Sequence, residues 1–327
     1  MKEKPMDRLI ADLAPSVADL GARGGLDEDM LPIAWAGHAI GFEPDPDEAT
    51  RLATVGDPRW RKTTILPYAV GGESGSAVLH VPESNEGASL LPHNAAMIDA
   101  YGYENLHATK KRFPVDVHTL DELRQRGELP RIDYLKIDIE GAELQVLKAA
   151  AETLCDCVAI KVECSFLEQR IGQPLIWEVA SYLLGCGFCA MDIRDIRRWR
   201  RRNLPAHPYR VDFQMPYSRG QLAQCDLIFL KAPKAVSDID QTLRLVVLSA
   251  VLGYYDYAIT VLRTNPDVAT AIERKYGIAL ERELEAWSRD AGRREARAAI
   301  KSSIRGLIPL MRSALNCLPY PAPRNAY

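Results

Sequence analysis

Short apolar segments alternate with amphipathic helical patterns over the first two-thirds of the chain, and this alternation constrains the fold more than any other feature. Repeated β-α units form a mostly parallel sheet with helices on both faces. Beyond about residue 233 the strand patterns end, and helical patterns follow that are broken at Gly253, Asn265-Pro266 and Gly277. We therefore expect an α/β domain over residues 1–232 and a helical C-terminal appendage over residues 233–327.

Seven segments have the length and apolar composition of strands. They are residues 16–21, 38–44, 63–70, 133–140, 157–165, 188–193 and 225–232. The segment SAVLHVPES, between the third and the fourth of these, predicts a hairpin. Helices are expected over residues 46–54, 142–151 and 175–184.

Composition narrows the class of protein. Lys and Arg number 41 against 44 Asp and Glu, so the net charge of −3 provides no broad basic field, and we expect no nucleic-acid partner. The seven cysteines do not show the spacing of a zinc site. The N-terminal segment lacks the features of a secretory signal, and no apolar run reaches the ~18 residues of a membrane span, so we expect a cytoplasmic protein.

The segment DLGARGG, residues 19–25, places glycines directly after a predicted strand, where a backbone can approach a ligand closely. Its glycines do not have the G-x-G-x-x-G spacing of a dinucleotide site. The carboxylate of Asp19 would repel a pyrophosphate but would favour the cationic ammonium and sulfonium of S-adenosylmethionine (SAM). A nicotinamide oxidoreductase is therefore a disfavoured alternative.

A second acidic residue follows about 20 positions later, where the next predicted strand ends in Gly41-Phe42-Glu43-Pro44. Glu43 is placed to accept hydrogen bonds from ribose hydroxyls, which SAM and NAD share. The alternative is structural: Asp19 caps a helix and Glu43 is a solvated strand end. Both acids lie at the carboxyl ends of strands, where open α/β sheets bind ligands, and this favours the functional interpretation.

The stretch RIDYLKIDIEGAEL, residues 131–144, carries Lys136, Asp138 and Glu140 in alternation with apolar residues on a strand predicted to be central. Central parallel strands are normally apolar on both faces, so these charges must be paired or lie at a cleft. The next strand carries Lys161 and Glu163, and we expect a lysine of one strand to lie beside a carboxylate of the other.

Asp138 and Glu140 are candidates for a general base or for orienting an acceptor hydroxyl, and Lys136 is a candidate for keeping a neighbouring carboxylate ionised. Two other interpretations stay open. The charges can form a buried structural network, or Asp138, Glu140 and Glu163 can hold Mg²⁺, although the spacing does not require a metal.

These segments resemble the FkbM family of methyltransferases. The resemblance is carried by GFEPDPDEATRL, IDYLKIDIEGAELQVLKAA, KVECSFLEQRIGQPLIWEVASYLLGCGF and CDLIFLK, and it covers roughly residues 16–232. It implies a Rossmann-like class I methyltransferase sheet of seven strands with the last one antiparallel. It also implies SAM as cofactor and, usually, O-methylation of a hydroxyl on a sugar, polyketide or related metabolite.

The residues expected to contact SAM are Asp19, Gly21, Ala22, Arg23, Gly25, Glu43, Pro44, Ala69 and Ser89. The glycine loop departs from the family's commoner D-x-G-A-N-x-G, because Arg23 replaces a small polar residue. Arg23 could pair directly with the carboxylate of SAM. A protein that keeps the fold but only binds SAM or a partner is the alternative to an enzyme.

Six arginines surround Trp199 in DIRDIRRWRRRN, residues 192–203, which we expect to lie between two late strands. Arg197, Arg198 and Arg201 predict recognition of an anionic acceptor, because guanidinium groups bind carboxylates and phosphates in a planar geometry. The alternative is a solvated charged segment. The basic terminal helix is expected to pack on the protein's own core or on a second subunit rather than on a membrane.

Overall fold

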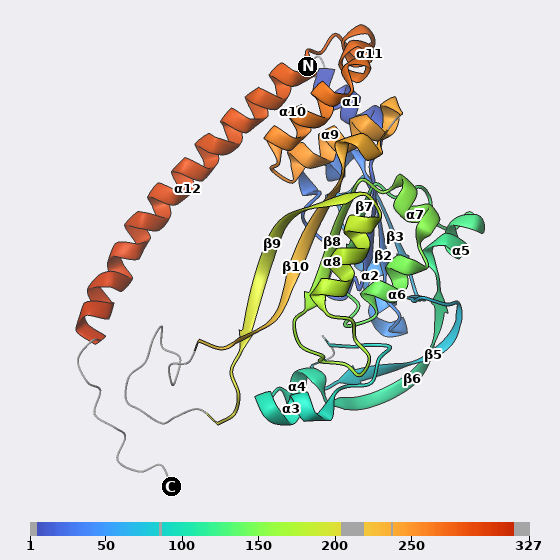
Figure 1. The fold of residues 1–327 in the computed structure, drawn as a ribbon, viewed down its shortest axis with the longest axis vertical. Coiled ribbons are helices and arrows are strands. Elements are labelled where there is room, and N and C mark those ends of the chain that lie inside the picture. The colour runs from blue at the N-terminus through green and yellow to red at the C-terminus, as the bar shows by residue number, and fades with distance from the viewer. Residues whose placement is uncertain (1–4, 85–86, 204–218, 237, 317–327) are drawn as a thin grey trace.

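The computed structural model describes residues 5–84, 87–203, 219–236 and 238–316, and a seven-stranded sheet forms its centre (Figure 1). In spatial order the strands are β3 (Lys62–Leu66), β2 (His38–Phe42), β1 (Ser16–Leu20), β7 (Tyr134–Ile137), β8 (Ala159–Ser165), β10 (Gln221–Lys231) and β9 (Phe188–Trp199). Neighbouring strands from β3 to β8 are parallel, whereas β10 is antiparallel to both β8 and β9. The predicted Rossmann-like sheet with an antiparallel last strand is confirmed.

A second, small sheet has the order β4 (Ala69–Val70), β6 (Thr109–His118), β5 (Gly75–Pro82). Two sequence predictions are wrong here. The strand expected over residues 63–70 is split between the two sheets at Pro67, since proline has no N–H to continue a ladder. The segment SAVLHVPES is not a hairpin, because most of it lies in β5, which pairs antiparallel with β6.

Helices cover both faces of the large sheet. On one face, α5 (Leu120–Gln125), α6 (Glu143–Lys148), α7 (Ala151–Asp156) and α8 (Ile176–Gly185) enclose a core that includes Leu20, Leu135 and Ile160. The single helix predicted over residues 142–151 is wrong, because α6 and α7 are separate helices that meet at Ala149-Ala150. The helix predicted to follow β2 is present as α2 (Pro46–Val55).

On the opposite face, α1 (Pro5–Leu13) and η1 (Leu31–Ala36) pack with α9 (Ile239–Val251) and α10 (Tyr255–Thr264). Their common core includes Leu9, Val17, Tyr134, Leu245 and Val261. The predicted C-terminal helices are therefore present and pack against the sheet. The division of the chain into domains at residue 232 stays a prediction.

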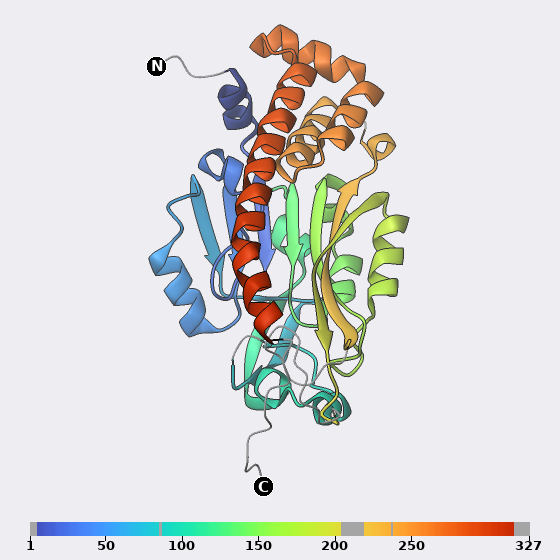
Figure 2. The ribbon, with the colours of Figure 1, turned by 90° about the vertical axis from the view of Figure 1, so that its left-hand side faces the viewer.

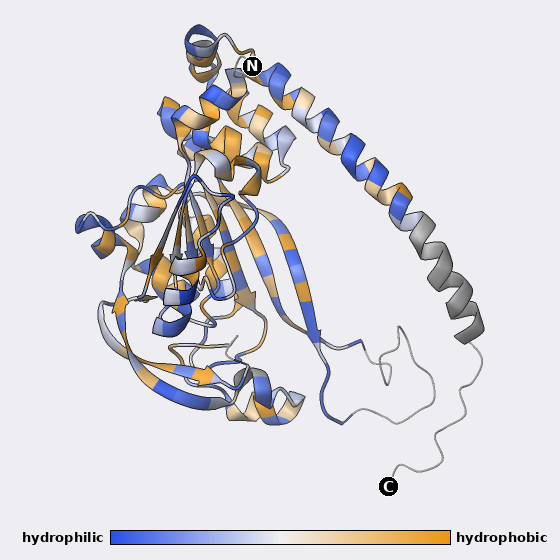
Figure 3. Cartoon of the chain, turned by 180° about the vertical axis from the view of Figure 1, so that it is seen from behind, coloured by the Kyte–Doolittle hydropathy of each residue, from blue (hydrophilic) through white to orange (hydrophobic). Residues whose placement is uncertain are grey.

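The remaining helices are η2 (Pro233–Ala235), α3 (Ala95–Tyr101), α4 (Glu104–His107), α11 (Pro266–Tyr276) and α12 (Leu280–Asn316). The predicted breaks at Gly253, Asn265-Pro266 and Gly277 separate α9, α10, α11 and α12. Helix α12 is a single helix of 37 residues that runs along the long axis of the molecule (Figure 2). It contacts α9, α10 and α11, and residues 292–303 are exposed and largely hydrophilic (Figure 3).

No helix within the described residues combines the length and the apolar character that crossing a lipid bilayer requires. The six cysteines in these residues are all free thiols.

Candidate active site

The charged residues of the central strands are aligned in a way that differs from the sequence prediction. Lys136 of β7 lies directly opposite Lys161 of β8 in the sheet, so lysine neighbours lysine and not a carboxylate. Each lysine forms its ion pairs with carboxylates that lie outside the β7–β8 pairing. Lys136 pairs with Asp19 and Asp138, and Lys161 Nζ lies 2.9 Å from Asp27 Oδ2 in the loop after β1.

The pair of Asp19 and Lys136 joins β1 to β7 inside the molecule. Lys136 Nζ lies 3.0 Å from Asp19 Oδ1 and 3.5 Å from Asp138 Oδ2, and it donates to the carbonyl oxygen of Gly21. Burial by itself would lower the pKa of Lys136, but the charges of Asp19 and Asp138 raise it above its usual value. Lys136 therefore remains a cation at neutral pH.

The glycine loop is tied to the sheet at both ends. The N–H groups of Gly21 and Ala22 donate to the carbonyl oxygen of Phe42, and the N–H of Asp27 donates to Asp19 Oδ2 at 2.7 Å. Gly21 has φ +86°, and a Cβ at this position would overlap the carbonyl oxygen of Asp138. Only glycine permits this close approach of the loop after β1 to the loop after β7.

The loop after β7 is held by three side chains. Glu140 has φ +62°, a left-handed conformation that costs free energy for a residue with a side chain. Its carbonyl oxygen accepts a hydrogen bond from Ser89 Oγ at 2.7 Å. Glu143 accepts from the N–H groups of Ile139 and Gly141, and the buried Arg170 Nη2 lies 3.3 Å from Glu140 Oε2. These contacts fix the direction of the Glu140 carboxylate.

A cavity of about 250 Å³ opens where these loops meet the carboxyl ends of β1, β2 and β7. Its lining combines backbone and apolar groups with four acidic and two basic side chains. The residues are Leu20, Gly21, Arg23, Phe42, Glu43, Pro44, Tyr68, Ala69, Val70, Leu79, Ala88, Ser89, Leu90, Asp138, Ile139, Glu140, Glu163 and Arg197.

Glu43 forms one wall of this cavity. Its side chain is buried, and Oε1 accepts a hydrogen bond from the N–H of Asp45 at 2.9 Å. Arg23 Nη2 lies 2.8 Å from Asp45 Oδ2 and 3.4 Å from Glu43 Oε1, so it bridges the two acids. Burial raises the pKa of Glu43, although the hydrogen bond from Asp45 and the charge of Arg23 oppose this rise.

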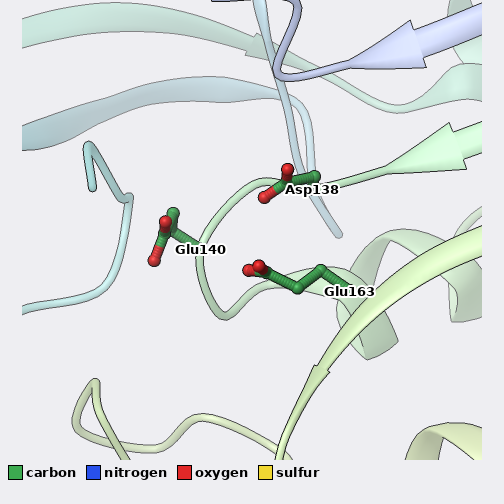
Figure 4. Close-up of side chains that lie close together, drawn as sticks. All are labelled: Asp138, Glu140 and Glu163. Carbon is green, nitrogen blue, oxygen red and sulfur yellow. The ribbon is translucent and has the colours of Figure 1, made fainter. Parts of the chain in front are cut away.

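Three carboxylates gather at the other wall, beside the loop that follows β7 (Figure 4). Asp138, Glu140 and Glu163 each offer an oxygen atom within 4.8 Å of the others. Burial raises the pKa of Glu140 to about 7, against the opposing charge of Arg170. Burial and the nearby carboxylates raise the pKa of Glu163 well above its usual value. The group can therefore hold and release a proton near neutral pH.

Most of the residues predicted to bind SAM come together in this cavity. Gly21, Arg23, Glu43, Pro44, Ala69 and Ser89 line it, as do the predicted catalytic residues Asp138 and Glu140. Asp19, Ala22, Gly25 and Lys136 are not in its lining. Asp19, at the end of β1, and Ala22, within the loop, are both buried, and Lys136 is almost buried between Asp19 and Asp138.

The arginine-rich segment was expected between two late strands, and the structure corrects this. Arg194, Arg197 and Arg198 lie within β9, which extends to Trp199 because Trp199 is buried against Tyr101 and Tyr103. Irregular pairing with β10 on both sides of Arg197 changes the local twist of the strand.

The predicted arginines separate into different environments. Arg197 lines the cavity, and its charge acts on the carboxylate of Glu140, although within the described part of the chain its guanidinium forms no hydrogen bond or direct ion pair. Arg198 is not in the cavity lining, and Arg201 stacks on the ring of Tyr101.

Sequence reasoning missed Arg170 and Glu143 as residues that shape the site. Glu143 lies within the segment EGAE, but its role as acceptor for the Ile139 and Gly141 N–H groups depends on the bend of the loop. Arg170 lies within the segment KVECSFLEQRIGQPLIWEVASYLLGCGF that carries the resemblance, but its role was not predicted, because only the fold brings it to Glu140.

The comparisons with known proteins agree with the family resemblance found in four segments between residues 16 and 232. Residues 19–189, more than half of the chain, match a family model described as the methyltransferase FkbM domain. The hexuronic acid methyltransferase AglP of Haloferax volcanii is 27% identical over 117 residues, which is 36% of this chain. The match spans 43% of that relative's length.

The buried ion pair of β1 and β7 yields a first prediction. Asp19→Ala should lower the free energy of unfolding by about 3 kcal/mol, because it removes the nearest partner of the Lys136 ammonium within the sheet. Urea denaturation followed by circular dichroism measures the change. Glu285→Ala is the control, since it breaks an exposed pair with Arg289 and should leave the midpoint unchanged.

The double variant Asp19→Leu/Lys136→Met removes both charges of the pair at once. It therefore tests whether the loss of stability in Asp19→Ala comes from leaving Lys136 without its nearest partner. It should recover most of the lost stability, because no uncompensated charge remains in the sheet. Equal stability of Asp19→Ala and the natural protein would show that this pair does not secure the loop.

Proposed function

Because this chain belongs to the FkbM methyltransferase family, we propose that it transfers the methyl group of SAM to a hydroxyl oxygen of an acidic sugar or a related anionic metabolite. The observation that carries this proposal is the cavity beside Gly21, whose lining includes four carboxylates, from Glu43, Asp138, Glu140 and Glu163. An acidic, partly enclosed cavity favours a ligand with cationic groups.

The residues present fit SAM. The donor has a sulfonium, an ammonium, a carboxylate and a ribose. Glu43 at the end of β2 can accept hydrogen bonds from the ribose hydroxyls, as an acid at this position does in related nucleoside sites. Gly21 has a positive φ and lines the cavity, so the loop brings its backbone to the wall of the proposed donor site. Pro44, Ala69 and Ser89 complete the walls of the donor site.

Arg23 has two possible partners in the proposed complex. It now bridges Glu43 and Asp45, with the shorter contact to Asp45. Ribose hydroxyls that reach Glu43 would replace the longer contact of 3.4 Å and leave Arg23 available for the carboxylate of the donor. Asp19 would contribute to this site indirectly, through its hydrogen bond to the loop and its pair with Lys136.

The acceptor hydroxyl would lie at the wall formed by Asp138 and Glu140. SAM supplies an electrophilic methyl group when it is bound. Asp138 and Glu140 would orient the hydroxyl toward that methyl group, which lowers the barrier because both reactants are held in line. Lys136 pairs with Asp138 through a contact of 3.5 Å, and Arg170 fixes the direction of Glu140.

Arg197 is the reason to propose an anionic acceptor. It lines the same cavity as the carboxylates, and its charge acts on Glu140 without a direct ion pair to an acid of the described residues. A carboxylate on the acceptor would provide a direct partner and hold the sugar beside Asp138 and Glu140. The relative AglP, named as a methyltransferase for hexuronic acid, supports an acceptor of this kind.

The donor site is tested by isothermal titration calorimetry with SAM. Glu43→Gln should weaken binding by about 10-fold or more, because charge-assisted hydrogen bonds contribute roughly 1.5–3 kcal/mol. Asp47→Asn is the control, since Asp47 is exposed at the start of α2 and does not line the cavity. Unchanged affinity in Glu43→Gln would reject this cavity as the donor site.

The same titration separates the proposed enzyme from its alternatives. Binding of NADH in place of SAM would favour an oxidoreductase. Binding of SAM without methyl transfer to any acceptor would favour a protein that uses the fold only for binding.

The acceptor class is tested with pairs of sugars that differ only in charge, such as p-nitrophenyl β-glucuronide and p-nitrophenyl β-glucoside, with isotope-labelled SAM. The natural protein should prefer the charged member of a pair. Arg197→Ala should raise the KM for the charged sugar by about 10-fold and leave the neutral sugar unaffected. Arg198→Ala is the matched control, and an equal effect of both substitutions would contradict a specific role for Arg197.

A further inference from the structure

Glu163 on β8 lies at the cavity beside Asp138 and Glu140 (Figure 4). The three carboxylates differ in what neutralises them. Asp138 pairs with Lys136, and Glu140 pairs with Arg170. Glu163 accepts a hydrogen bond from the neutral side-chain amide of Gln224. Within the described residues, no lysine or arginine forms an ion pair with it.

The direction of the Gln224 amide is determined by its other neighbour. Gln224 is buried, and its Oε1 atom faces Gln169 Nε2, which donates to it at 3.4 Å. The Gln224 Nε2 atom is therefore the one that faces Glu163. This arrangement leaves the remaining oxygen of Glu163 available to the cavity.

The surroundings of Glu163 are otherwise acidic. Asp138, Glu140 and Glu143 approach it from the loop after β7 and from α6, and Asp226 approaches it from β10. Lys161, two residues earlier on β8, is occupied by Asp27, Asp29 and Asp226. A carboxylate without a cationic partner, among other carboxylates, has a raised affinity for protons.

The position of Glu163 also fits the direction from which the acceptor would enter. Arg197 of β9 lies opposite Gln224 of β10 in the sheet, and Gln224 in turn contacts Glu163. An acceptor whose anionic group reaches Arg197 is thereby held beside the carboxylate group. Its hydroxyl can then lie between the methyl donor and Glu163.

We propose that Glu163 is the general base of the reaction and that Gln224 is its positioning residue, an inference that rests on the proposed methyl transfer. The acceptor oxygen forms a bond to the methyl carbon while its proton passes to a Glu163 carboxylate oxygen. The bond between the methyl carbon and sulfur breaks, and its electron pair remains on sulfur. Asp138 and Glu140, which are held by Lys136 and Arg170, orient the hydroxyl.

The first test compares Glu163→Gln with Glu140→Gln in methyl-transfer assays across pH 5–9. Glu163→Gln should lower kcat by about 10²–10⁴-fold, the usual contribution of a general base, and leave the KM for SAM within about twofold. In the natural protein kcat should rise with pH as Glu163 loses its proton. This rise should be absent in Glu163→Gln and present in Glu140→Gln.

Gln224→Leu tests the positioning role and remains informative if Glu163→Gln does not fold. Loss of the amide donor removes a hydrogen bond that favours ionised Glu163, so the rise in kcat should move to higher pH. The value of kcat at high pH should remain close to that of the natural protein. A lower kcat at every pH with an unmoved profile would indicate a merely structural residue and overturn the positioning role.

A second readout does not depend on turnover. A cationic donor stabilises the ionised form of nearby carboxylates, so SAM binding should release protons at pH 7. Calorimetry in phosphate and in Tris buffer measures this release, which should be smaller in Glu163→Gln than in the natural protein.

The two readouts distinguish a failure of this inference from a failure of the proposed function. Equal proton release together with a kcat within threefold of the natural protein would exclude Glu163 as the base and leave methyl transfer intact. SAM binding without transfer in the natural protein would instead reject the proposed function. Equal proton release in Glu163→Gln would then still exclude Glu163 as the group that titrates.

Discussion

Lys136 lies on β7 in the middle of the central sheet, where a buried positive charge must be paired. Its Nζ atom lies 3.0 Å from Asp19 Oδ1 on the neighbouring strand β1. Lys161 lies opposite Lys136, so a second cation needs its own partner, and Asp27 provides it. Asp27 also donates its N–H to Asp19. The glycine loop is thus connected to both lysines of the sheet. The position of the loop, and with it the shape of the cavity, depends on this charged network.

The same network explains why neighbouring carboxylates can have different chemistry. Lys136 reaches Asp138, and Arg170 reaches Glu140, whereas Glu163 receives only an amide. A carboxylate that is held by a cation is fixed in direction and serves to orient a ligand. A carboxylate without such a partner exchanges its proton more readily near neutral pH. The distribution of partners, rather than the number of acids, would give each residue its role.

The sequence predicted the sheet well, because apolar strands, glycine breaks and helix spacing are local signals. It also predicted that Gly21, Glu43 and Asp138 lie at one edge, since all follow the carboxyl ends of strands. It could not predict the alignment of Lys136 with Lys161, because register between strands depends on the packing of both faces. Arg170 was missed for a related reason, as only the tertiary fold brings it to Glu140.

The most direct test of the account is a crystal structure of the chain with S-adenosylhomocysteine, the product that methyl transfer would leave behind. The account predicts density in the cavity beside Gly21, with the ribose hydroxyls at Glu43 and the sulfur facing the wall of Asp138, Glu140 and Glu163. Density that occupies another site while this cavity contains only water would contradict it.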